Sequence, residues 1–185
     1  MRNVTIKGLE FEPYISREQI DLRLNDLAAK IEEDFSGQCP IFICVLNGAF
    51  AFAADLFRKV RLESEITFIK LQSYIGTGTT GKVKEIIGLN TSIEGRPVII
   101  VEDIVDTGIT MYNLICDLRQ RGASIIKVAS LLHKPDALQK EVTIDYLGFS
   151  IPNKFIVGYG LDLDGLARNL PDIYILRGTI DAKCH

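Results

Sequence analysis

Glu102, Asp103 and Asp106 place three carboxylates in one short stretch of this 185-residue sequence. They follow the apolar run 98–101 and precede the small, hydroxyl-bearing stretch 107–110. Carboxylates accept hydrogen bonds from sugar hydroxyls, coordinate hydrated magnesium or act as general bases. Backbone N–H groups of such a stretch, at the start of a helix, form an anion pocket, and threonine hydroxyls add donors. The stretch 102–110 therefore predicts a site that holds an anion next to a sugar, a metal ion or a titrating group.

A plainer interpretation of residues 102–110 is also open. The acids could be solvated at the end of a strand, with Asp106 as the N-cap of the following helix. An isolated pair of acids would favour that interpretation. Here the order along the chain is a buried strand, then the acids, then a hydroxyl-bearing loop and a helix. This order favours a binding site.

Residues 76–83 contain two further glycine patterns that fail on context. Residues 76–81 satisfy G-x-G-x-x-G, but the sequence that follows favours a strand, whereas a dinucleotide-binding motif must open a helix. The phosphate-binding P-loop needs Ser or Thr after Gly81-Lys82, and Val83 stands there. We expect residues 73–82 to form a flexible lid loop instead. A P-loop nucleotide hydrolase remains the alternative enzyme class.

The elements that position these residues alternate between strands and helices. Apolar spacing predicts helices over 16–35, where Ser16 and Gln19 form a capping box, over 49–59, and after Thr110. Apolar runs predict strands at 41–46, 66–71, 98–101, 125–132, 146–149, 155–157 and 173–176, with 83–89 pairing to 66–71 as a hairpin. The fold class is therefore α/β, with a mostly parallel sheet flanked by helices and ligands at the carboxyl ends of the strands.

Composition narrows the class of protein. We expect one domain, residues 1–185, since 47% hydrophobic and 24% charged residues are ordinary for a globular chain. The net charge of −3 disfavours nucleic acid as a partner, and no apolar run reaches the length of a membrane span or a signal peptide. The four cysteines form no C-x-x-C pair, which favours a reducing cytoplasm.

The stretch 102–110 resembles the phosphoribosyl-pyrophosphate motif of the type I phosphoribosyltransferases, and the whole chain resembles their hypoxanthine-guanine branch. Five segments match in order, and these are 46–48, 73–74, 102–110, 131–134 and 148–162 with Arg168 after it. The resemblance implies that a 6-oxopurine base and 5-phosphoribosyl-1-pyrophosphate give a nucleoside monophosphate and pyrophosphate, as in purine salvage. It also implies Mg²⁺ as the cofactor and a small hood made from the N- and C-terminal segments.

The resemblance assigns roles position by position. Asp106 would be the general acid/base at purine N7. The phosphoribosyl donor would be bound by Glu102, Asp103, Thr107, Gly108, Ile109 and Thr110. The purine would be bound by Lys134, Phe155, Ile156 and Asp162. Pyrophosphate would be bound by Leu46, Asn47, Gly48, Ser73, Tyr74 and Arg168. Magnesium would be held by Glu102, Asp103 and Asp162.

Two positions depart from the family pattern. Asn47 stands where many relatives carry lysine, and Ile109 where some do. Both loops would therefore act through backbone N–H groups, and the family often has a cis peptide in the first of them. Relatives are commonly dimers or tetramers, so we expect a homodimer or homotetramer. A non-catalytic regulator that senses the donor on the same fold is the alternative outside the enzymes.

Overall fold

The computed structural model of the protein describes residues 2–72 and 84–178. Within them, one sheet has six strands in the order β5-β4-β3-β6-β7-β8. Their bounds are β3 Ile41–Leu46, β4 Glu65–Gln72, β5 Lys84–Ile87, β6 Pro97–Val105, β7 Ile125–His133 and β8 Tyr146–Ser150. All neighbours are parallel except β4 and β5, which pair antiparallel. The predicted parallel sheet and the predicted hairpin partner of β4 are both confirmed.

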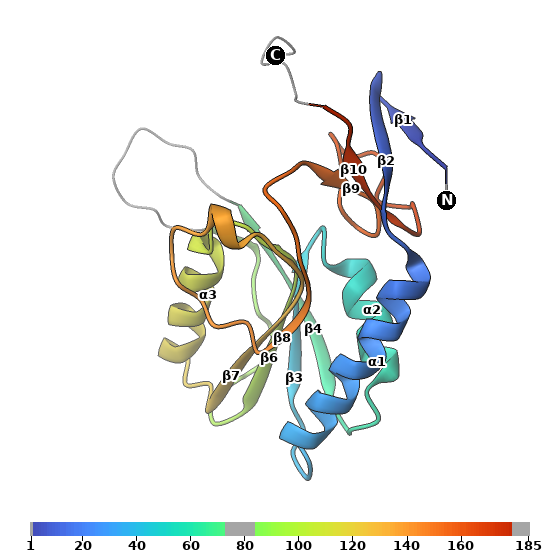
Figure 1. Ribbon diagram of the computed structural model, residues 1–185. Helices are drawn as coiled ribbons and strands as arrows, with labels where there is room; N and C mark the ends of the chain where they lie inside the picture. The colour runs from blue at the N-terminus through green and yellow to red at the C-terminus, as the bar shows by residue number, and fades with distance from the viewer. Residues whose placement is uncertain (1, 73–83, 179–185) are drawn as a thin grey trace.

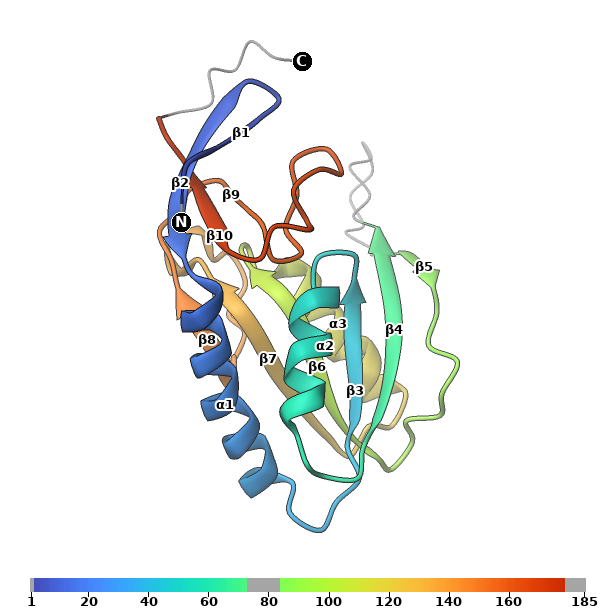
Figure 2. The same ribbon diagram turned by 90° about the vertical axis from the view of Figure 1, so that its right-hand side faces the viewer.

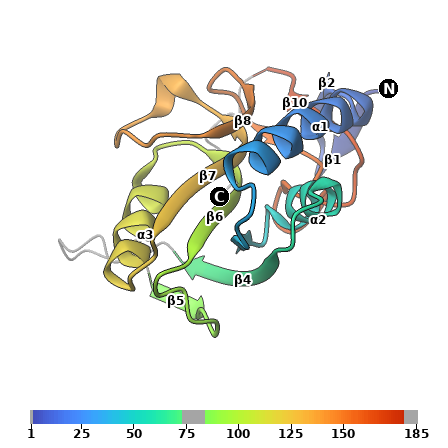
Figure 3. The same ribbon diagram turned by 90° about the horizontal axis from the view of Figure 1, so that it is seen from below.

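Helices cover both faces of this sheet (Figures 1 and 3). α1 Arg17–Asp34 and α2 Phe50–Lys59 lie on one face, and α3 Ile109–Gln120 lies on the other. α1 begins at the predicted capping box, in which the Ser16 hydroxyl accepts from the Gln19 N–H and the Gln19 side chain accepts from the Ser16 N–H. Among the described residues no helix is both long and apolar enough to span a membrane.

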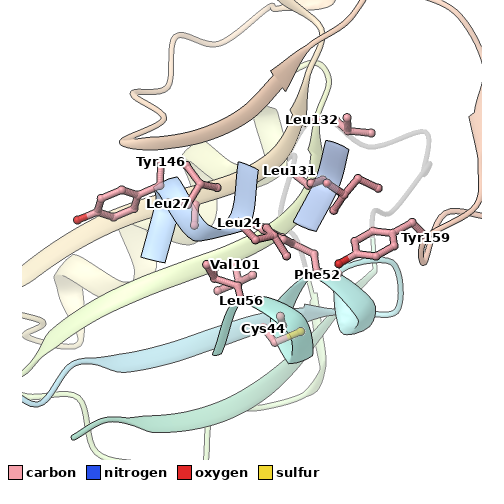
Figure 4. Close-up of a cluster of buried hydrophobic side chains, with 14 of the residues drawn as sticks. Leu24, Leu27, Cys44, Phe52, Leu56, Val101, Leu131, Leu132, Tyr146 and Tyr159 are labelled. Atoms are coloured by element: carbon pink, nitrogen blue, oxygen red, sulfur yellow. The ribbon is translucent and has the colours of Figure 1, made fainter. Parts of the chain in front are cut away.

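β3 and β6 are buried on both faces, which explains their uninterrupted apolar runs. Phe42 and Cys44 of β3 lie in the cluster that also holds the inner faces of α1 and α2. Ile41 and Ile43 lie in the opposite cluster, against α3. Figure 4 shows the first cluster, with Cys44 beneath the leucines and Phe52 of the two helices. Both faces of the central strands are therefore packed, and the loops after these strands begin from well-packed backbone.

A smaller antiparallel sheet stands beyond the carboxyl ends of the parallel strands (Figure 2). It has the order β1-β2-β10-β9, with β1 Val4–Ile6, β2 Leu9–Ile15, β9 Ile156–Val157 and β10 Ile173–Leu176. We call this sheet and residues 158–172 the hood. The strands predicted at 155–157 and 173–176 exist, but they belong to the hood and not to the parallel sheet. The strands at residues 4–15 were not predicted.

Cys44 gives a first testable consequence of this packing. Its side chain is fully buried, and burial raises the pKa of the Cys44 thiol to about 12, with the Glu102 and Asp103 charges contributing further. Since the thiolate is the reactive form, we expect iodoacetamide at pH 8 to leave Cys44 unmodified in the native protein while the partly exposed Cys39 and Cys116 react. Peptide mass spectrometry after timed labelling measures this.

The unfolded protein is the control, since every thiol should then react. Labelling of native Cys44 as fast as Cys116 would contradict the expectation. Because the folded chain raises the thiol pKa above its ordinary 9.0, the free energy of unfolding should also fall as the pH rises above that value.

Candidate active site at the carboxyl edge of the parallel sheet

Three predicted site segments follow adjacent parallel strands and meet at one edge of the sheet. Residues 46–48 run from the last residue of β3 into the loop after it. Residues 102–106 span the end of β6, and Lys134 directly follows β7. The strand order β3-β6-β7 places these ends side by side, and Figure 2 shows that all three point toward the hood. Segments far apart in the sequence therefore share one site, as the topology of parallel sheets requires.

Lys134 and Asp106 form an ion pair at the centre of this edge. The Lys134 Nζ lies 3.3 Å from the Asp106 Oδ2. The lysine side chain is only 11% exposed, whereas the aspartate is 45% exposed. The Lys134 N–H donates to the Val105 carbonyl at 3.0 Å, which fixes the backbone next to the acid. A cationic donor and a carboxylate acceptor are thus adjacent, and the carboxylate is open to a ligand.

Glu102 and Asp103, which lie in the last part of β6 before Asp106, form a compact acidic pair. The Asp103 N–H donates to the Glu102 Oε1 at 3.2 Å, and the Ile104 N–H donates to the Asp103 Oδ1 at 3.0 Å. Burial raises the pKa of Glu102 well above its usual range, and the neighbouring Asp103 charge raises it further. A cation or a hydroxyl donor bound here would relieve this repulsion.

The 107–110 loop forms a small pocket at the start of α3. Gly108 is the helix N-cap, with φ of +76°, and the Thr107 hydroxyl, not Asp106, accepts from the Ile109 N–H at 3.5 Å. The interpretation of Asp106 as a helix cap is therefore not supported. A cavity of about 100 Å³ is lined by residues of the 102–111 segment, including Asp106, Thr107, Gly108 and Thr110. Backbone N–H groups and hydroxyls at a helix start are suited to an anion.

The segment after Lys134 holds the 107–110 loop in place through backbone hydrogen bonds. The Thr107 carbonyl accepts from the N–H groups of Gln139, at 2.9 Å, and Lys140, at 3.0 Å. A Cβ at Gly108 would overlap the Lys140 carbonyl. Sequence reasoning missed Gln139 and Lys140 because they contribute backbone groups, which no local motif records.

The 46–48 loop reaches the acidic pair from the neighbouring strand. The peptide bond between Leu46 and Asn47 is cis. A Cβ at Gly48 would overlap the Asp103 carboxylate, so the backbone of this loop lies directly against that side chain. The resemblance assigned Gly48 to pyrophosphate and Asp103 to the donor and the metal, and the structure brings these two residues into contact.

The hood, and Phe155 directly before its strand β9, supply the remaining described site residues. Phe155 packs against Phe11 with ring centroids 6.3 Å apart. Ile156 pairs with Ile175 of β10. Asp162 accepts from Arg168 Nη2 at 2.7 Å.

Arg168 and Asp162 are also bound within the hood. Arg168 Nη1 donates to the Gly160 carbonyl at 2.6 Å. The second oxygen of Asp162 accepts from the Gly165 N–H at 2.6 Å. The predicted contacts of Ser73 and Tyr74, and the predicted lid at 73–82, lie outside the described residues.

Comparison with known proteins identifies the family. A family model for the phosphoribosyl transferase domain matches residues 16–164. A hypoxanthine-guanine phosphoribosyltransferase of Streptococcus thermophilus is 39% identical over 169 residues, which cover 91% of this chain and 94% of that protein. The chain belongs to the hypoxanthine-guanine phosphoribosyltransferase family.

Further relatives agree with this assignment. A hypoxanthine-guanine-xanthine phosphoribosyltransferase of Tritrichomonas foetus is 40% identical over 166 residues, covering 89% of this chain and 91% of that protein. A crystal structure of a hypoxanthine-guanine phosphoribosyltransferase from Bacillus anthracis matches with a TM-score of 0.84 and 40% identity over 90% of this chain and 97% of that one. The fold is the type I phosphoribosyltransferase fold, as the resemblance implied.

Proposed function

We propose that the protein transfers a phosphoribosyl group from 5-phosphoribosyl-1-pyrophosphate to hypoxanthine, and to guanine, giving IMP or GMP and pyrophosphate. The observation that carries this proposal is the Lys134–Asp106 pair, 3.3 Å apart, beside the 107–110 loop. A 6-oxopurine presents a carbonyl oxygen and an N7 proton on the same edge. One donor and one acceptor side by side match that edge, and they stand next to a pocket suited to the donor's phosphate.

The donor would be held by the β6 end and the loop after it. Thr107, Gly108, Ile109 and Thr110 would bind the 5′-phosphate through backbone N–H groups and hydroxyls. Glu102 and Asp103 would accept hydrogen bonds from the ribose 2′- and 3′-hydroxyls. The support for these roles is the cavity of about 100 Å³ at the loop and the unfavourable charge on Glu102, which hydroxyl donors would stabilise.

The reaction is a displacement at the anomeric carbon. The bond between purine N9 and C1′ forms as the bond between C1′ and the pyrophosphate oxygen breaks, through an oxocarbenium-like state. Asp106 would accept the N7 proton as N9 becomes bonded, and general-base help of this kind is worth about 10²–10⁴-fold. Lys134 would donate to the 6-oxo oxygen, which selects against adenine because its 6-amino group is itself a donor.

Mg²⁺ is the cofactor that this acidic site fits. Glu102, Asp103 and Asp162 offer only oxygen ligands, and Mg²⁺ is usually bound by one or two carboxylates together with water and substrate phosphates. Within the described ranges no three His, Cys, Asp or Glu side chains form a metal cage, so substrate oxygens would complete the site. When bound, Mg²⁺ disperses the charge of the leaving pyrophosphate.

The hood and the 46–48 loop would hold the other substrate groups. Phe155 would stack on the purine, and Ile156 would bind its edge through the backbone. Leu46, Asn47 and Gly48 would bind pyrophosphate through their backbone, with Arg168, Ser73 and Tyr74. Asp162 would bind both the purine and the metal ion.

Replacing Lys134 by alanine tests the purine assignment. We expect kcat/KM for hypoxanthine to fall at least about tenfold, because a charged hydrogen bond to the 6-oxo oxygen is lost. The affinity for the donor should change less than about twofold, since Lys134 is not assigned to it. Steady-state kinetics and calorimetric donor titration measure the two quantities. Lys30→Ala, at an exposed lysine of α1, is the control, and equal losses for purine and donor would make Lys134 structural.

A spectrophotometric assay with the four common purines, the donor and Mg²⁺ tests the function itself. We expect turnover of hypoxanthine and guanine with release of pyrophosphate, and none of adenine. Tight ATP binding without base-dependent pyrophosphate release would favour the nucleotide hydrolase. Donor binding with no turnover of any base would favour the regulator.

We also propose a single domain over residues 1–185, a cytoplasmic location and a homodimer or homotetramer without nucleic-acid or membrane partners. The net charge of −3 and the resemblance support these assignments. Light scattering coupled to size-exclusion chromatography measures the oligomeric state, and an electrophoretic mobility assay tests the absence of nucleic-acid binding.

A further inference from the structure

Tyr159 connects the hood to the parallel-sheet half of the molecule. It follows β9 with φ of +49°, and only 6% of the residue is exposed. Its hydroxyl donates to the Asp55 Oδ2 of α2 at 2.7 Å. Figure 4 shows the Tyr159 ring entering the buried cluster from the C-terminal segment, with its oxygen toward the helices. Over residues 2–72 and 84–178 no strand pairing joins the hood to the parallel sheet, so this hydrogen bond is a side-chain link between the two.

The next residue, Gly160, lies against the 46–48 loop. A Cβ at Gly160 would overlap the Gly48 carbonyl oxygen, so the two backbones are in direct contact. The Gly160 N–H donates to the Arg168 carbonyl at 3.0 Å, and its own carbonyl accepts from Arg168 Nη1 at 2.6 Å. Tyr159 thus stands one residue from the point where the 46–48 loop, the hood and Arg168 meet.

We propose that Tyr159, through Asp55, is a positioning residue that holds the hood against the 46–48 loop and so shapes the pyrophosphate half of the donor site. This inference rests on the proposed function, because it assigns pyrophosphate to Gly48 and Arg168. α2 begins directly after the 46–48 loop, so a hydrogen bond to Asp55 fixes the hood to the element that continues that loop.

The surroundings of the hydrogen bond keep it formed. Burial raises the pKa of Tyr159, and the Asp55 carboxylate raises it further, so the phenol remains a donor throughout the neutral range. The other Asp55 oxygen pairs with Arg58 Nη2 at 2.5 Å on the surface of α2. A cavity of about 240 Å³ adjoins the pair, lined also by Arg17, Asp21 and Lys59. Asp55 therefore stays solvated when the tyrosine hydroxyl is removed.

Tyr159→Phe is the direct test, since it removes one hydroxyl and keeps the buried ring. We expect the Kd for the donor with Mg²⁺ to rise about fivefold or more, because a hydrogen bond to a charged group is lost. The Kd for ribose 5-phosphate should change less than about twofold, because that ligand carries neither the pyrophosphate nor the purine that the hood would contact. Isothermal calorimetry of the full chain measures both. A structural defect would weaken both ligands together.

Three further variants make the test decisive. Arg58→Ala removes the other partner of Asp55. The Arg58 side chain is 75% exposed, so this variant should leave both affinities unchanged. Asp55→Ala should reproduce the selective loss, and Asp55→Asn, which keeps an acceptor, should restore most of it. Tyr159→Phe combined with Asp55→Ala should be no worse than Asp55→Ala alone.

The outcomes separate this inference from the proposed function. Selective weakening of donor binding supports the positioning role. Equal weakening of donor and ribose 5-phosphate, or no change in either, overturns it. If Tyr159→Phe fails to fold, the Asp55→Ala and Asp55→Asn variants give the same decision. A wild-type protein that binds neither donor nor IMP overturns the proposed function itself.

Discussion

Replacing Asp106 by asparagine is expected to lower kcat for IMP formation at least about tenfold, and up to the 10²–10⁴-fold that general acid–base catalysis contributes. Asparagine keeps the size and the hydrogen-bonding acceptor but cannot take the N7 proton. The fold should be intact, because the side chain is 45% exposed and does not cap α3. Single-turnover kinetics is the suitable measurement, since it separates the chemical step from product release.

The same substitution removes the charged partner of Lys134, so the loss has to be assigned with care. Hypoxanthine affinity should be measured in the variant, because a freed lysine acts on binding rather than on proton transfer. Asp136→Asn is the matched control, as Asp136 is an exposed acid on the short turn after Lys134. An unchanged kcat would remove Asp106 from the general acid/base role.

Replacing Gly48 by alanine is expected to lower kcat/KM for the donor by about 10²-fold, the cost of moving a binding group by about 1 Å. The added Cβ would overlap the Asp103 carboxylate, which must then leave its position beside the ribose and metal site. Gly48 does not have a left-handed φ, so the penalty comes from the contact and not from the backbone. Steady-state kinetics with varied donor measures the effect.

Gly37→Ala is the control for Gly48→Ala. Gly37 has φ of +72° and no neighbour within 4 Å of an added Cβ, so its substitution costs about 1 kcal/mol of stability without touching the site. Thermal unfolding of both variants separates the effects. If the donor kinetics of Gly48→Ala match those of the wild type, then donor use does not require the Asp103 carboxylate at its observed position.

The parts that local sequence determines were predictable. Ser16 and Gln19 begin α1 through hydrogen bonds to neighbouring backbone, so the capping box is visible in the sequence. β3 is apolar throughout because both of its faces are buried. Residues 102–110 were recognisable because a strand, three acids and a helix start stand in one stretch, and the parallel topology then placed Lys134 next to them.

The parts that depend on distant partners were not predictable. β2 contains Pro13 and two exposed glutamates, and only Phe11 and Ile15 of its side chains are buried. It pairs with β10, at the other end of the chain, and with β1 across a two-residue turn at Lys7 and Gly8, both with positive φ, which is a local signal that the sequence analysis missed. The contact of Gly48 with Asp103 and the hydrogen bond of Tyr159 to Asp55 are long-range, so no local pattern marks them.

The strand order of the hood has a consequence for synthesis on the ribosome. All strands of the parallel sheet have been made once residue 150 has emerged, whereas β2 obtains its partner β10 only when residue 176 has emerged. Because chains fold as they are made, from the N-terminus, the 102–110 loop and its acids can form before the hood that would complete the purine and pyrophosphate contacts. Until then the free edge of β2 is exposed to other strands. Nascent chains ending between these two points should therefore hold the 5′-phosphate end of the donor, and should bind its pyrophosphate end and a purine only once the hood has formed.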